Sequence, residues 1–151
     1  MSLDLAVRNG LDGAEILRRW IDEGLAPGFA GLLGFQVVAF GEGTVRLECP
    51  VSARHANLMA GVHGGVMAGL ADAATGCALL SLVGSDEQFA TTDLQIRYLR
   101  AAPLDAGPLT VEARIVHKGR RMAVAECEMM TGEGRVHARA SASMMITPRP
   151  R

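Results

Sequence analysis

The residues whose types and spacing could do chemistry gather in one stretch of the chain, residues 57–83. They are Asn57, His63, Gly64, Gly65 and Asp72. Asp72 is the only charged residue between positions 66 and 83, and its neighbours are almost all apolar or small. A carboxylate in such surroundings costs free energy unless something uses it, so Asp72 marks a candidate catalytic site.

Gly64 and Gly65 stand where an apolar run with the composition of a buried helix begins. The first N–H groups of a helix have no intrahelical partner, and the helix dipole adds partial positive charge there. Glycine lets a ligand oxygen approach these groups closely, so they could stabilise a carbonyl oxygen that becomes an oxyanion. A tight loop-to-helix junction is the alternative interpretation of the glycine pair.

Asp72 has two chemical roles open to it. Apolar surroundings raise the pKa of a carboxyl group, and such a group serves as a general base for water or as a nucleophile on an acyl carbon. The alternative is a structural Asp that is hydrogen-bonded to the backbone or to a hydroxyl such as that of Thr75. Sequence alone leaves the three roles open.

The spacing of Gly64 and Asp72 limits how they could cooperate. Eight positions correspond to roughly 12 Å along a helix, at about 1.5 Å per residue. A reacting carbon must lie about 3 Å from both groups, which one helix cannot provide. Two antiparallel helices from two subunits would place Asp72 of one chain near Gly64 of the other, so we expect an active site across a two-fold dimer interface.

Composition restricts the class of protein. A chain of 151 residues predicts one domain spanning residues 1–151. A formal net charge of -1 and 4% aromatic residues argue against nucleic-acid or membrane-surface binding. Three dispersed cysteines without a CxxC pair predict a reducing, cytoplasmic location, and we see no signal peptide. The apolar run barely reaches membrane-spanning length and contains Asp72, which favours a core helix.

The periodicity predicts an α+β fold of one long helix wrapped by a single antiparallel sheet of about five to six strands. Short helices are expected within residues 1–34, with Asp12 as a cap and Gly24 as a stop. A hairpin at 35–51 precedes the long helix, and four strands follow it. In the first of these, Thr92, Leu94, Ile96 and Tyr98 are expected on one face, and Asp93, Gln95 and Arg97 on the other. Residues 147–151 are expected to form a disordered tail.

The order of these motifs resembles the hotdog-fold acyl-CoA thioesterases, and most closely the phenylacetic-acid-degradation (PaaI-like) group related to 4-hydroxybenzoyl-CoA thioesterases. The resemblance rests on Asn57, the His63-Gly64-Gly65 triplet, Asp72 on the apolar helix, the strand TTDLQIRYLR and the turn HKGR. It spans roughly residues 34–146. One departure is Ala101 where the family has proline after YLR, with Pro103 two positions later.

The resemblance implies a hydrolase of acyl-CoA thioesters that needs no cofactor, because coenzyme A is part of the substrate. It implies that Asp72 activates water or attacks the acyl carbon and that the Gly64 amide, with that of Gly65, binds the thioester oxygen. Asn57 and His63 would orient the carbonyl or water, and the Thr91 hydroxyl would face the acid. A homodimer, arranged as a dimer of dimers, is the expected assembly.

Binding residues are predicted at the rim and in the pocket. Cations at strand ends and turns would hold the phosphates of coenzyme A, with Arg120 favoured because the Gly-Arg turn recurs in the family: Arg97, Arg100, Lys118, Arg120 and Arg121. Leu58, Met59 and Met67 are expected against the acyl group, whose identity stays open between an aryl group and a medium chain. His55, His117 and His137 lack metal-ligand spacing and are expected to face solvent, and no metal site is predicted.

Two other functions remain open from the sequence. A hotdog dehydratase or hydratase would act on acyl thioesters with a histidine base, whereas here the acid in the helix favours hydrolysis. An acyl-CoA-binding module without turnover would normally carry a DNA-binding segment, and residues 1–34 are short and insufficiently basic for one.

Overall fold

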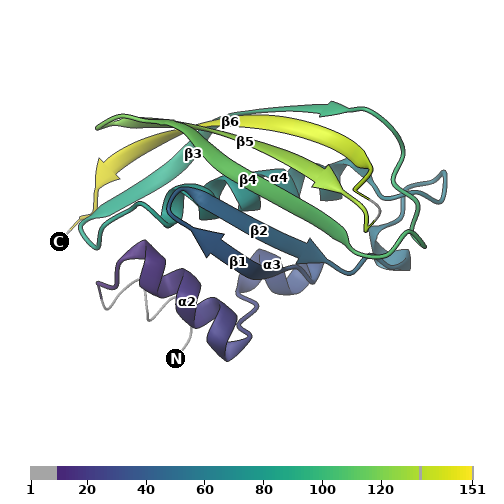
Figure 1. Ribbon diagram of the computed structural model, residues 1–151, viewed down its shortest axis with the longest axis horizontal. Helices are drawn as coiled ribbons and strands as arrows, with labels where there is room; N and C mark the ends of the chain where they lie inside the picture. The colour runs from purple at the N-terminus through teal and green to yellow at the C-terminus, as the bar shows by residue number, and fades with distance from the viewer. Residues whose placement is uncertain (1–9, 133, 151) are drawn as a thin grey trace.

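One antiparallel sheet curves over one face of a long helix in the computed structural model, which describes residues 10–132 and 134–150. The strands are β1 (Gln36–Gly41), β2 (Thr44–Cys49), β3 (Glu87–Tyr98), β4 (Leu109–Lys118), β5 (Met122–Met130) and β6 (Val136–Pro148), in the spatial order β1-β2-β4-β5-β6-β3. The helices are α2 (Gly13–Glu23), α3 (Gly28–Leu33) and α4 (Gly64–Leu80). Figure 1 shows α4 beneath the sheet, as the predicted α+β hotdog arrangement requires.

Helix α4 fits under the sheet because both surfaces carry small side chains. Ala71, Ala74 and Ala78 of α4 are fully buried, and α4 contacts all strands except β1 closely. On β6, Ala138 and Ala140 are also buried. Small residues on both sides let the helix axis approach the sheet, which buries a helix that is apolar on nearly all sides.

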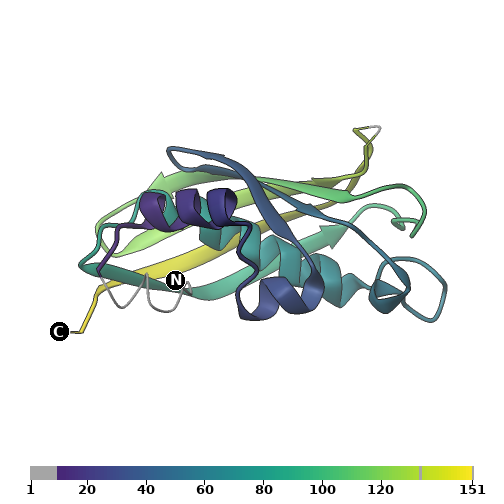
Figure 2. The same ribbon diagram turned by 90° about the horizontal axis from the view of Figure 1, so that it is seen from below.

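The two N-terminal helices lie on the side of the molecule that carries α4 (Figure 2). Asp12 caps α2 by accepting a hydrogen bond from the Glu15 N–H at 2.8 Å, and Gly24 ends it with a left-handed φ of 60°. The buried residues of α2 include Ile16, Leu17 and Trp20. The shorter helix α3 packs on α4 through Phe29, whose ring lies against Gly69.

Strands β1 and β3 are the two edges of the sheet. Strand β3 is twelve residues long, pairs only with β6, and leaves most of its side chains exposed or half-buried. An edge of this length presents a row of unpaired backbone groups to another strand. This edge lies next to the candidate site.

The ends of the chain differ in part from the prediction. Thr147 and Pro148 belong to β6 and pair with Gln88 and Glu87, so the predicted tail at 147–151 is wrong for these two residues. Arg151 and residues 1–9 of the predicted N-terminal segment lie outside the described residues. No helix in the described part of the chain is long and apolar enough to cross a membrane.

Candidate active site

Asp72 and Thr91 meet where α4 passes strand β3. The Thr91 hydroxyl donates a hydrogen bond to Asp72 Oδ1 at 2.8 Å. A hydroxyl can donate one hydrogen bond and accept others. Thr91 can therefore hold the Asp72 carboxylate and still accept a hydrogen bond from a water molecule. The contact joins residues 19 positions apart, and it agrees with the expectation that a hydroxyl at 91 faces the acid.

A β-bulge aims Thr91 at α4. Thr91 lies opposite Met144 and Asp93 lies opposite Ser143, so Thr92 is the extra residue of β3. The Thr92 hydroxyl donates to the Ser143 carbonyl at 3.1 Å. The prediction that Thr92 shares one face with Leu94 and Ile96 by strict alternation is therefore wrong, because alternation fails at a bulge.

The Asp72 side chain is exposed in a single chain, so the prediction that it lies in buried, apolar surroundings is wrong for the isolated subunit. Its position explains this exposure: β3 is the last strand of the sheet, and no further strand of the same chain covers the acid. Asp72 nevertheless lines a cavity of about 310 Å³ whose other lining residues carry no charge. The aromatic residues of this cavity are Trp20, Phe29, Phe35 and Phe89.

The start of α4 has one free donor rather than two. His63 is the N-cap, and its Nδ1 accepts a hydrogen bond from the Gly65 N–H at 2.8 Å. Within the described residues, no partner lies on the Gly64 N–H. Tyr98 on β3 donates its hydroxyl to the Gly64 carbonyl at 2.7 Å, which fixes the Gly64–Gly65 peptide that follows this N–H. The geometry thus favours Gly64 over Gly65 as the oxyanion donor.

The loop before α4 is organised by Asn57. Its Oδ1 accepts from the Met59 N–H at 2.8 Å and from the Gly61 N–H at 3.1 Å, and Ala60 adopts a positive φ of 59°. Leu58 and Met59 are fully exposed at the loop tip. Neither residue lines the cavity at Asp72 or the cavity beside Gly64 in its own chain.

A second cavity, of about 340 Å³, lies beside the helix start. Asn57, Gly64, Met67, Tyr98 and Arg100 are among its lining residues. Of the predicted pocket residues, Met67 thus lines the same cavity as Gly64 and is buried. We call the cavity that contains Asp72 the acid-side cavity and the one that contains Gly64 the amide-side cavity. The two share no lining residue.

The predicted cations do not lie together in one chain. Arg100 lines the cavity at Gly64, whereas Arg120 and Arg121 lie at the opposite end of the sheet with Glu87. Lys118 ends β4 near them. Arg97 lines a hollow on the sheet face turned away from α4. One subunit therefore places only Arg100 near a proposed catalytic group.

Besides His63 the chain has three histidines, which were predicted to face solvent. His117 is exposed as predicted, whereas His55 and His137 are buried, so the prediction is wrong for these two. His137 donates from Nδ1 to the Ala101 carbonyl at 2.9 Å, and its Nε2 lies 3.2 Å from the Thr131 hydroxyl. His55 accepts the Ser52 N–H on Nδ1 at 2.9 Å and donates from Nε2 to the Leu33 carbonyl at 2.7 Å.

His55 also has a role at the helix start that the sequence did not indicate. Its carbonyl accepts the His63 N–H at 2.8 Å, so this buried residue connects α3 to the cap of α4. No sequence pattern points to it, because the contact with Leu33 joins residues 22 positions apart.

Cys77 lines the acid-side cavity but does not supply a nucleophile at neutral pH. Burial, and to a smaller extent the Asp72 charge, raise the pKa of the Cys77 thiol to about 12. A thiol with this pKa stays protonated and unreactive. Cys49 and Cys127 are also free and buried.

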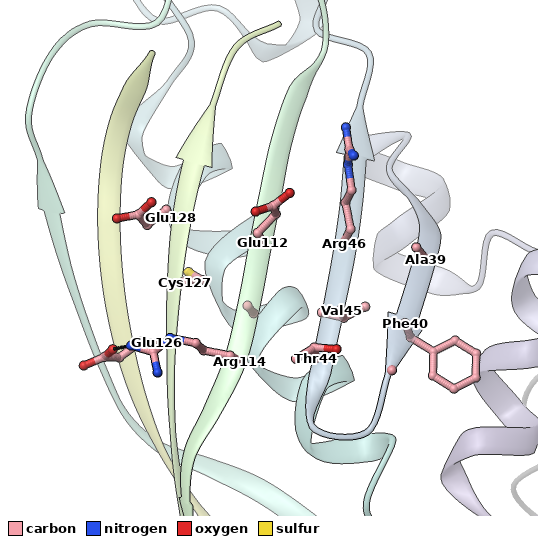
Figure 3. A pocket seen from close by; sticks show the side chains of 12 residues that line it. Ala39, Phe40, Thr44, Val45, Arg46, Glu112, Arg114, Glu126, Cys127 and Glu128 are labelled. Carbon is pink, nitrogen blue, oxygen red and sulfur yellow. Dashed lines mark hydrogen bonds and ion pairs between the residues drawn. The ribbon is translucent and has the colours of Figure 1, made fainter. Parts of the chain in front are cut away.

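A hollow of about 530 Å³ lies on the outer face of the sheet, and Figure 3 shows side chains that line it. Arg114 and Glu126 form an ion pair there at 2.9 Å, and both side chains are at least half exposed. Exposed pairs of this kind are solvated and contribute little. None of the predicted catalytic residues reaches this face. No cluster of His, Cys, Asp or Glu within the described residues is arranged to hold a metal ion.

Comparisons with known proteins give a consistent result. A model of the thioesterase superfamily matches residues 59–138, which include Gly64, Asp72 and Thr91. The chain is also 33% identical over 125 residues to a protein of Halobacterium salinarum whose name gives esterase as a provisional activity. That match covers 80% of this chain and 79% of the relative.

Two solved structures share the fold. A hypothetical thioesterase protein from Streptococcus pneumoniae, solved with coenzyme A, has a TM-score of 0.70 at 27% identity and covers 78% of this chain and 88% of its own. The E. coli PaaI protein, from the phenylacetic acid degradation operon, has a TM-score of 0.75 at 24% identity, with coverages of 88% and 92%. The second likeness concerns the fold alone.

Proposed function

The chain belongs to the thioesterase superfamily and is a thioester hydrolase, and we propose that its substrates are acyl-CoA thioesters with an aryl or medium-chain acyl group. The observation that carries the proposal is the Asp72 carboxylate, which is held by Thr91 at 2.8 Å and lines an otherwise uncharged cavity. Such a cavity suits an apolar acyl group placed beside a base. We place the chain in the PaaI-like branch on the motifs around Asn57, Gly64 and Asp72.

In the proposed reaction, the Gly64 N–H stabilises the oxyanion that forms as the acyl carbon is attacked. If Asp72 is a base, it takes a proton from water, the water oxygen bonds to the acyl carbon, and the carbon–sulfur bond breaks. The proton then passes to the coenzyme A thiolate. If Asp72 is a nucleophile, its oxygen bonds to that carbon as the thiolate leaves, and water hydrolyses the anhydride.

A single turnover in ¹⁸O-water with enzyme in excess identifies the nucleophilic route in which water opens the anhydride at the Asp72 carboxyl carbon. Attack by water on the acyl carbon places ¹⁸O in the first product acid. Attack by Asp72, followed by water attack on its carboxyl carbon, places ¹⁸O in Asp72, where mass spectrometry of its peptide would detect it.

We propose that the site is completed by a second copy joined through strand β3. The strand contacts the acid through Thr91 and the Gly64 peptide through Tyr98, seven positions further on. In an antiparallel β3–β3 pair with its two-fold axis at Gln95, and with the bulged Thr92 left out of the pairing, the partner's Tyr98 lies opposite Thr91. This arrangement carries the partner's Gly64 toward Asp72, which a single helix cannot do.

The same arrangement would assemble the cations. Arg120 and Arg121 lie near the start of β3, and Arg100 follows its end. Antiparallel pairing brings the partner's Arg100 toward these two arginines, which would make a cationic rim for the coenzyme A phosphates. We further propose that two such dimers form a tetramer; light scattering after size exclusion would test the assembly.

Hydrolysis of a panel of aryl- and alkyl-CoA thioesters, ranked by kcat/KM, tests the function. We expect measurable turnover for at least one class and its loss in Asp72→Asn with retained ligand binding. An acyl-CoA-binding module would show binding in both proteins and turnover in neither, and a dehydratase or hydratase would convert an enoyl thioester without releasing coenzyme A. The absence of free coenzyme A from every substrate would contradict the proposal.

We also propose that the reaction needs no cofactor or metal. Dialysis against EDTA should leave kcat unchanged, and recovery of activity only after Zn²⁺ or Mg²⁺ is added would contradict this. The three free cysteines support a reducing, cytoplasmic location, which cell fractionation would test.

A further inference from the structure

The acid-side cavity is built in the same way on both sides of Asp72, with a glycine of α4 beneath an aromatic ring. Gly69 lies one turn before Asp72 on α4, and Gly76 lies one turn after it. An aromatic ring occupies the space over each glycine. A Cβ built on Gly69 would lie 2.9 Å from two atoms of the Phe29 ring, and one on Gly76 would lie 3.6 Å from the Phe89 ring. The two rings are therefore walls on opposite sides of the acid.

The Phe89 wall is fixed by the core. Phe89 is a half-buried residue of β3, and it packs against the small buried cluster that includes Leu79, Met144 and Ile146. Its ring therefore cannot move without disturbing buried neighbours.

The Phe29 wall is built differently. Phe29 is 52% exposed and belongs to α3, which has six residues and no side-chain cap. The helix is tied down at its other end, where the Leu33 carbonyl accepts from His55 Nε2 at 2.7 Å and from the Arg54 guanidinium at 3.3 Å. The backbone of α3 thus carries Phe29 to the cavity, while half of the ring surface stays free of packing.

We propose that Phe29 is a specificity-determining residue that limits the size of the apolar acyl group beside Asp72, an inference that rests on the proposed thioesterase function. Apart from Asp72, the described residues that line the cavity are uncharged, so the cavity favours an uncharged acyl group. The core holds the Phe89 end fixed, whereas Phe29 can be shortened without opening the core. Replacing Phe29 therefore changes how much acyl group the cavity accepts.

Turnover of butyryl-, hexanoyl-, octanoyl- and decanoyl-CoA by Phe29→Ala tests the proposal. We expect the kcat/KM ratio of the longest to the shortest substrate to rise about tenfold or more, because each methylene accommodated in an apolar pocket has an effect of this order. Leu32→Ala is the matched control: Leu32 is on the same helix, is 70% exposed and does not line the cavity. Its substrate ranking should stay that of the wild type.

Gly69→Ala supplies an independent perturbation of the same contact. Its methyl group would displace the Phe29 ring, since the nearest ring atoms lie at 2.9 Å from the Cβ position. We expect an altered substrate ranking in Gly69→Ala, and a much smaller effect of the same change in the Phe29→Ala background. Equal effects in both backgrounds would mean that Phe29 does not transmit the change.

Trp20 provides a readout that needs no turnover. It is the only tryptophan of the chain and lines the cavity with Phe29. Titration with 1-hexanol, 1-octanol and 1-decanol, followed by Trp20 fluorescence, should show roughly a fourfold gain in affinity per buried methylene up to a limiting length. That limit should move to longer alkanols in Phe29→Ala and stay in place in Leu32→Ala.

The outcomes separate this inference from the proposed function. If the wild type hydrolyses thioesters but Phe29→Ala changes neither the substrate ranking nor the alkanol limit, the inference is wrong and the function stands. If the wild type hydrolyses none, the function fails, and the alkanol series still decides whether Phe29 bounds the cavity. Circular dichroism and the milder Phe29→Leu variant, which should give a smaller shift in the same direction, exclude misfolding as the cause.

Discussion

The proposed site has two ends: at Asp72, in the middle of α4, the reactive group is a side chain, whereas at Gly64, the first residue of the helix, it is a backbone N–H. The Asp72 carboxylate is oriented by one side-chain contact, from Thr91, and its wider surroundings are aromatic. The Gly64–Gly65 peptide that follows the Gly64 N–H is held by Tyr98 at its carbonyl and by the His63 cap at its N–H. A side-chain group can be deleted by one substitution, whereas a backbone donor can only be displaced. The two ends should therefore respond differently to mutation.

The largest expected effect is at the side-chain end. Asp72→Asn should lower kcat by about 10³-fold, because the amide can neither accept the proton nor attack the acyl carbon. Activity measured with saturating acyl-CoA checks this, and Asp93→Asn, on the other face of β3, should retain wild-type kcat. A kcat within tenfold of wild type in Asp72→Asn would remove Asp72 from the mechanism.

Mixing variants tests whether the two ends belong to different subunits. Asp72→Ala and Gly64→Ala homodimers should each be nearly inactive, yet mixed subunits should recover about a quarter of wild-type activity. Half of the randomly paired dimers would be heterodimers, each with one intact site. Absence of recovery from subunits that demonstrably exchange would contradict the shared site.

The backbone end should show the next largest effect. In Gly64→Ala the new Cβ would lie 3.2 Å from the Tyr98 ring, so the helix start must shift and the N–H moves with it. We expect kcat to fall about 10²-fold, the loss typical for one oxyanion donor. Gly65→Ala should cost less, because the Gly65 N–H already binds His63. Equal losses would mean that both amides are used.

Thr91→Val should have a smaller effect, of about tenfold in kcat. The substitution keeps the shape of the side chain but removes the hydroxyl that orients the Asp72 carboxylate. Thr92→Val is the matched control, because Thr92 donates to the Ser143 carbonyl and not to the acid. A larger loss in Thr92→Val than in Thr91→Val would mean that the bulge itself, and not the contact with Asp72, matters.

The sequence predicted the helices and strands of this fold better than the irregular positions within and between them. Alternation and helical periodicity located six strands and the long helix, because these patterns report which face of an element is buried. They failed at Thr92, where the bulge shifts the register, and at His55, whose burial depends on a carbonyl of α3. Both failures involve contacts between distant segments, which local patterns do not record.

The candidate site was predictable in its residue types but not in its surroundings. The spacing of Gly64 and Asp72 indicated that one helix cannot hold a complete site, and the structure places the two residues in separate cavities. Periodicity could not indicate that Asp72 is exposed in one chain, because it treats every residue of an apolar run alike. Nor could it indicate that His63 Nδ1 accepts a hydrogen bond from the Gly65 N–H, since this depends on a side-chain rotamer.

The smallest expected effect concerns Cys77, which lines the same cavity as Asp72. Because the pKa of its thiol is raised to about 12, Cys77 carries no charge at the pH of the reaction. Cys77→Ala should therefore leave kcat at pH 7 within about twofold of wild type, since a protonated thiol is no nucleophile. The raised pKa predicts instead a loss of stability as pH rises from about 9 toward 12, because the unfolded thiol ionises first. Chemical denaturation of wild type and Cys77→Ala across this range measures the difference, and a loss of stability that is equal in both proteins would assign it to other groups.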